Sequence, residues 1–98
     1  MANIALATML FIGCSSQPTE DARQNRRLVD GLLTAVTIKN RKELDRCMAM
    51  LDERRANAVL SESHHKRLTE IYSEAKAGEW AKAEEALYKF RELDPFPK

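Results

Sequence analysis

Apolar residues recur every three or four positions along most of this chain, from about Asp21 onward. That spacing places them along one side of an α-helix. No proline occurs between Asp21 and Pro95, and Gly31 is the only glycine in that stretch before Gly78. The pattern therefore predicts an all-α fold.

The first predicted helix covers residues 21–39. Its apolar stripe is formed by Leu28, Leu32 and Val36 and is widened by Val29 and Leu33. Gly31 lowers the helix propensity by about 1 kcal/mol relative to alanine, and the β-branched residues near the end lower it further. Burial of the stripe is therefore expected to stabilise this helix.

A second helix is predicted to start at Asn40, because Asn40 and Glu43 resemble a capping box. It is expected to run through the charged residues 52–55 towards Leu60. The side chains expected to be buried on it are Leu44, Cys47, Met48 and Leu51, with Met50 as a further packing residue.

The third helix is predicted to start at a cap formed by Ser61 or Ser63 and to end at Ala77-Gly78. The fourth is expected to stop before Pro95. Their predicted buried residues are Leu68, Ile71, Tyr72 and Ala75, followed by Trp80, Ala83, Leu87, Phe90 and Leu93. Short connections make neighbouring helices antiparallel, so we expect a small bundle of about four helices arranged as two hairpins.

The start of the chain differs from the rest, because no charged side chain precedes Glu20. Its apolar run, residues 4–12, is about half the roughly 20 residues that a membrane-spanning helix needs, and it suits the apolar core of a secretory signal. Phe11-Ile12-Gly13-Cys14 resembles the lipobox of bacterial lipoproteins. The resemblance implies cleavage before Cys14 and lipidation of its thiol. The predicted organisation is a signal peptide (1–13), a lipidated cysteine and flexible tether (14–20), a helical domain (21–95) and a tail (96–98).

A second resemblance lies near the end of the chain. Gly78, Trp80, Ala83, Leu87 and Phe90, followed by Leu93-Asp94-Pro95, resemble the second helix of a tetratricopeptide repeat. The resemblance implies that Trp80 fills the base of a hairpin and that Ala83 lets its helices approach. Trp80, Ala83, Leu87 and Phe90 are thus the candidate structural or interaction residues. The preceding helix fits the pattern less well and no second copy is legible, so an extended peptide-binding groove is not expected.

Candidate chemistry is sparse. Sixteen Lys and Arg residues against fifteen Asp and Glu residues give a net charge of +1, which argues against a dedicated nucleic-acid surface. His64 and His65 point about 100° apart on a helix, so a shared metal is not expected. The densest basic patch is formed by Lys39, Arg41, Lys42 and Arg46. No catalytic, metal-binding or cofactor-binding motif is recognised, and we expect neither an enzyme nor a cofactor.

Two functional hypotheses remain. The first is a lipid-anchored envelope protein that faces the periplasm or the cell surface and contacts an unknown protein partner. The alternative is an unanchored cytoplasmic helical module, either monomeric or dimeric. Cys47 is expected to be a small buried residue, although a Cys14–Cys47 disulfide stays open if Cys14 carries no lipid.

Overall fold

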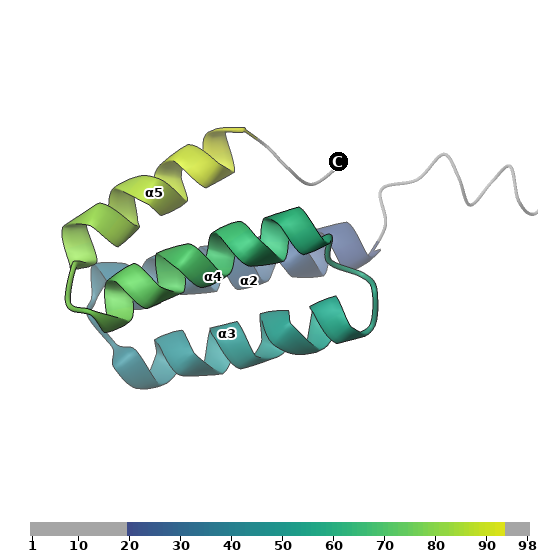
Figure 1. Ribbon diagram of the computed structural model, residues 1–98, viewed down its shortest axis with the longest axis horizontal. Coiled ribbons are helices and arrows are strands. Elements are labelled where there is room, and N and C mark those ends of the chain that lie inside the picture. Colours follow the sequence, from purple (N-terminus) through teal and green to yellow (C-terminus); the bar gives the residue numbers. More distant parts are fainter. Residues whose placement is uncertain (1–19, 94–98) are drawn as a thin grey trace, which may run out of the picture.

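The computed structural model describes residues 20–93, which form four helices. These are α2 (Glu20–Thr37), α3 (Arg41–Ala56), α4 (Glu62–Lys76) and α5 (Trp80–Glu92). Successive helices run in opposite directions, and no strand occurs in the described range (Figure 1). The all-α prediction is confirmed.

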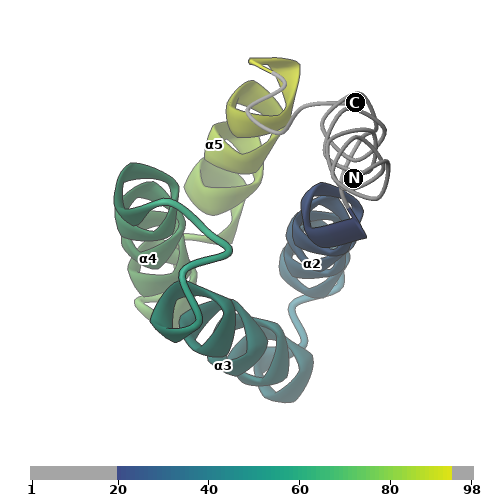
Figure 2. The ribbon, with the colours of Figure 1, turned by 90° about the vertical axis from the view of Figure 1, so that its right-hand side faces the viewer.

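The helices close into a ring around one core. α2 packs on α3, α3 on α4 and α4 on α5, and α5 returns to pack on α2 (Figure 2). The largest fully buried side chains come from all four helices: Leu32, Leu44, Leu51, Leu68, Ile71, Leu87, Val29 and Val36. The fold is therefore a bundle in which every helix has two neighbours.

The bundle has two different ends. The N-terminal end is where α2 and α4 begin and where α3 and α5 finish (Figure 1). The turn end holds the α2–α3 and α4–α5 connections, each three residues long between the helix bounds. These two names are kept below.

Two helix starts are capped as the sequence predicts. Asn40 Oδ1 accepts a hydrogen bond from the Glu43 backbone N–H at 3.0 Å. Ser61, and not Ser63, caps α4, because its Oγ accepts from the His64 backbone N–H at 3.2 Å. Each bond satisfies a backbone donor that the first helical turn leaves unpaired.

Three helix ends share one geometry. Lys39, Ala58 and Gly78 each have a positive φ, of 57°, 63° and 89° respectively. In each case the next backbone N–H bonds five residues back, which is the Schellman arrangement. The prediction that the second helix continues towards Leu60 is therefore wrong: α3 ends at Ala56, because the left-handed turn at Ala58 closes it.

Gly31 allows α2 and α3 to approach closely. A Cβ atom built on Gly31 would lie 2.9 Å from Cys47 Sγ, which is too short for a normal contact. Cys47 is a free thiol with 3% of its surface exposed, so its predicted burial is confirmed. Burial raises the pKa of this thiol, and it therefore stays protonated at neutral pH.

Some predicted core positions are wrong. Leu93 is 80% exposed, because it follows the last turn of α5 at the edge of the bundle. Met50 is 41% exposed, since it lies about 200° around α3 from the buried Met48. Trp80 and Tyr72 are only partly buried, whereas Leu60 is buried although it lies in the loop before α4.

Candidate functional site

The predicted lipidation site, Cys14, lies outside the described residues. The described part of the chain starts with α2 at Glu20, six positions after that cysteine and one residue before the predicted start of the domain. The first core residue is Ala22. All core side chains assigned to the bundle thus follow the proposed tether in sequence.

The four candidate residues on α5 belong mainly to the core. Ala83 and Leu87 have no exposed surface and Phe90 has 6%. Trp80 packs against the core edge, with the Arg41 guanidinium carbon 5.3 Å from its ring centroid. Ala83, Leu87 and Phe90 are thus part of the core of the bundle, and the resemblance to a tetratricopeptide repeat stays a prediction.

A buried polar network lies at the N-terminal end and joins α2 to α3 and to the α3–α4 loop. Asn25 is 3% exposed, and its Nδ2 donates to the Val59 carbonyl oxygen at 2.8 Å. Arg54 Nε donates to Asn25 Oδ1. Arg54 Nη2 donates to Asp21 Oδ1 at 2.9 Å. We call Asp21, Asn25, Arg54 and Val59 the Asn25 network.

The sequence analysis missed the Asn25 network. The available signal was an asparagine at the position of α2 that lies four residues before Val29, on the apolar stripe. A buried amide must be hydrogen-bonded, so such an asparagine indicates a specific partner. The partner itself could not be read from the sequence, because Val59 lies 34 residues away.

A second polar cluster lies near the turn end, between α3 and α4. Asp45 Oδ1 accepts from the Tyr72 hydroxyl at 2.7 Å and from Lys76 Nζ at 2.9 Å. The hydrogen bond from Tyr72 lowers the pKa of Asp45, and Lys76 lowers it further. The same bond raises the pKa of Tyr72, so this phenol stays protonated at neutral pH. We call these three residues the Asp45 cluster.

The adjacent histidines contact different neighbours. His65 Nε2 lies 2.7 Å from Asp52 Oδ1 on α3, and the His64 ring meets the Phe90 ring edge-on at 5.8 Å between centroids. Within residues 20–93, no group of three or more His, Cys, Asp or Glu side chains is placed to hold a metal ion.

The predicted basic patch is not a continuous free surface. Arg41 Nη1 donates to the Lys76 carbonyl oxygen at 2.9 Å, and Arg46 Nη2 lies 2.6 Å from Glu43 Oε2. Lys39 and Lys42 are exposed beside them. Two of the four cations are thus engaged in contacts within the bundle.

A shallow groove of about 540 Å³ lies between the start of α4 and the end of α5. Its apolar residues are Ala86, Phe90 and Leu93, and its polar residues are Ser63, His64, Arg67 and Lys89. None of these side chains is acidic. We call it the Phe90 groove.

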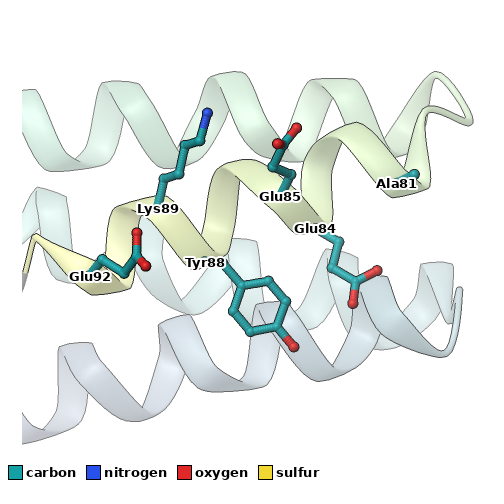
Figure 3. Close-up of a pocket in the computed structure, with 6 residues that line it drawn as sticks. All are labelled: Ala81, Glu84, Glu85, Tyr88, Lys89 and Glu92. Atoms are coloured by element: carbon teal, nitrogen blue, oxygen red, sulfur yellow. The ribbon is translucent and has the colours of Figure 1, made fainter.

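The outer face of α5 carries a second hollow of about 500 Å³ (Figure 3). Tyr88 is 49% exposed there. In Figure 3, Tyr88 and Glu84 point to the side of α5 that faces α2, whereas Glu85 and Lys89 point to the side that faces α4. This face therefore offers an exposed aromatic ring among carboxylates.

None of the helices described in residues 20–93 is long and apolar enough to cross a membrane. Within that range the structure thus contains the buried Asn25 network, the exposed Asp45 cluster and surface hollows that include the Phe90 groove and the hollow beside Tyr88. No family model, no curated protein and no solved structure matches this chain.

Proposed function

We propose that this chain is a small lipid-anchored protein of the bacterial envelope whose helical domain acts through protein–protein contacts. The observation that carries the proposal is the run Phe11-Ile12-Gly13-Cys14, which resembles a lipobox. Polar residues 15–19 follow it, and α2 starts directly after them at Glu20. This order suits an anchor, a tether and a folded head.

The anchor would hold the protein firmly at a membrane. A diacylglyceryl group on the Cys14 thiol together with an acyl chain on the exposed amine would bury many methylene groups, each contributing about 0.8 kcal/mol. Two or more chains give stable attachment, whereas a single myristoyl chain gives only marginal binding.

Membrane fractionation of two matched cysteine variants tests the anchor. The wild type and Cys47→Ala should sediment with membranes, whereas Cys14→Ala should be soluble. The Cys47→Ala control makes the same chemical change at a buried position. If wild type and Cys14→Ala are both soluble, the alternative of an unanchored module holds. An intact mass equal to that of the unmodified full-length chain in the membrane fraction would also contradict lipidation.

Tyr88 supports the second half of the proposal. Tyrosine is enriched in protein interfaces because it supplies a large contact area with few rotatable bonds. Its ring is half exposed on the outer face of α5 (Figure 3). A partner that docks there would meet Glu84 and Glu92 one turn away on either side, so we expect it to present basic groups.

Site-specific photo-crosslinking in intact envelopes tests this contact. A photoreactive amino acid at position 88 should give a discrete protein adduct, whereas the same residue at position 50 on α3 should not. Met50 is a suitable control because its exposure, 41%, is close to the 49% of Tyr88. Equal labelling from both positions, or none from position 88, would contradict a protein contact at α5.

A further inference from the structure

The Phe90 groove combines an apolar floor with cationic edges. Phe90 is 6% exposed at its base, whereas Leu93 is 80% exposed at its edge. Arg67 and Lys89 line the same groove, and no acidic side chain does. Within residues 20–93, Lys89 forms no ion pair, while Arg67 Nη1 lies 3.2 Å from Glu70 Oε1. Such a surface suits a ligand that is apolar in one part and anionic in another.

The position of the groove relates it to the proposed anchor. The groove is formed by the first turns of α4 and the last turns of α5, so it belongs to the N-terminal end of the bundle. α2 starts at that same end (Figure 1). From Cys14 to Glu20 there are six residues, which span at most about 20 Å when extended. An anchor at Cys14 would therefore keep the groove close to the headgroups.

We propose that the Phe90 groove rests on an anionic lipid surface, with Leu93 at the apolar boundary and Arg67 and Lys89 on lipid phosphates. The proposal depends on the anchor proposed above. A cation near an anionic membrane surface increases binding about fivefold, and this attraction falls off within a Debye length. The charge of the groove and the reach of the tether favour lipid over a protein occupant.

The consequence is a defined orientation of the anchored head. The groove would face the bilayer while α5 keeps the Tyr88 ring on its other flank (Figure 3). The Asp45 cluster near the turn end would point away from the lipid. A protein partner could then reach α5 without displacing the domain from the membrane.

A reconstituted system tests the orientation independently of lipidation in the cell. Residues 14–98, which contain the whole described core, are coupled through the Cys14 thiol to a maleimide lipid, because Cys47 is buried. The probe is Leu93→Trp in a Trp80→Phe background. Vesicles contain brominated phosphatidylcholine with or without phosphatidylglycerol. Circular dichroism checks that each protein is folded.

We expect the tryptophan at position 93 to be quenched and blue-shifted on vesicles that contain phosphatidylglycerol, and much less on neutral vesicles. Arg67→Gln combined with Lys89→Gln should lower the ratio of lipid-docked to undocked protein about 25-fold, because each cation contributes about fivefold. Lys39→Gln combined with Lys42→Gln removes the same charge at the turn end and should have no effect. High salt should also reduce quenching, as Arg67→Gln with Lys89→Gln does, because it screens the attraction between the cations and the lipid.

Three results would overturn the proposal. Equal quenching on neutral and anionic vesicles would show that charge plays no part. No quenching on either would show that the groove faces away from lipid. Phe96→Ser is a further variant for this test. If the tryptophan at position 93 is quenched only in Phe96→Ser, the chain's own residues 94–98 compete with lipid for the groove. Because the anchor is imposed chemically, none of these results bears on whether the cell lipidates Cys14.

Discussion

The two ends of this bundle are held by polar contacts of very different exposure. At the N-terminal end, the Asn25 network includes an amide that is 3% exposed and an arginine side chain that is 18% exposed. Near the turn end, the Asp45 carboxylate is 49% exposed and the Lys76 side chain 36%. Each set contains a charge-assisted hydrogen bond of 2.9 Å, from Arg54 to Asp21 in the first and from Lys76 to Asp45 in the second.

Burial determines what each set contributes to stability. An exposed pair exchanges bonds with water at little net gain, whereas breaking a buried bond leaves a donor or acceptor that water cannot reach. The Asn25 network should therefore be the more important of the two for the free energy of unfolding. The end that holds the first turn of α2 would then be the more strongly fixed.

The largest expected effect is that of Asn25→Ala. It removes the donor to the Val59 carbonyl oxygen and the acceptor for Arg54 Nε, so we expect a loss of about 3 kcal/mol in the free energy of unfolding. Urea denaturation followed by circular dichroism measures it.

Asn40→Ala is the matched control at the turn end. It removes only the exposed cap of α3 and should cost about 1 kcal/mol. Equal losses for the two variants would show that burial does not distinguish the two ends.

Gly31→Ala probes the packing between the two ends. Alanine has the better helix propensity, by about 1 kcal/mol, but its Cβ would lie 2.9 Å from Cys47 Sγ. We expect a net loss of about 1–2 kcal/mol, because an overpacked core must shift.

Cys47→Ala provides the sharper test, since it removes the sulfur that Gly31→Ala would meet. In that background Gly31→Ala should stabilise the bundle. A thermodynamic cycle built from four unfolding curves gives the coupling. If Gly31→Ala stabilises the wild type as well, then a Cβ atom at position 31 does not clash with Cys47, and the fold does not depend on glycine there.

The left-handed residues at the two ends should respond in opposite directions. Ala58 at the N-terminal end has a φ of 63°, whereas Gly78 at the turn end has a φ of 89°. A side chain in this region costs about 1 kcal/mol. Ala58→Gly should therefore raise the free energy of unfolding and Gly78→Ala should lower it, each by about that amount, as thermal unfolding would show. Changes of the same sign would contradict the shared geometry.

The smallest expected effect concerns pH at the turn end. Tyr72 and Lys76 lower the pKa of Asp45 below its ordinary value of 3.8, so this cluster stabilises the fold above that value. The contribution is lost as the pH falls through the lowered pKa. Tyr72→Phe should raise the pKa of Asp45 towards 3.8 and change stability less than Asn25→Ala does.

An NMR titration of the carboxyl carbons measures this shift. Glu43 is the internal control, because its pKa is lowered by Arg46 and not by Tyr72. A pKa of Asp45 that does not move in Tyr72→Phe would show that Lys76 alone is responsible.

Much of the secondary structure could be predicted because its causes are local. The caps at Asn40 and Ser61 and the end at Gly78 depend on hydrogen bonds between residues only three to five positions apart. Apolar spacing likewise predicted burial of Leu44 and Leu87. The end of α3 was missed because alanine at position 58 carries no local turn signal, although it adopts a left-handed conformation.

The candidate surfaces could be predicted far less well. Leu93 follows the same apolar spacing as Phe90, yet Phe90 is 6% exposed and Leu93 is 80% exposed. The Phe90 groove and the exposed ring of Tyr88 depend on how α5 sits against α4 and α2. Periodicity assigns a residue to one face of a helix, but it does not show where the neighbouring helix ends.

The sequence by itself determined four helices, most of their boundaries and the apolar faces that they bury, since these follow from helical spacing and caps. It also carries the lipobox-like run that ends at Cys14, on which the proposed function depends. Only the tertiary structure decided that α5 closes on α2, that Gly31 lies against Cys47 and that Asn25 pairs with Arg54 and Val59. Those contacts join residues 16 or more positions apart, and which of them form depends on the packing of the whole bundle.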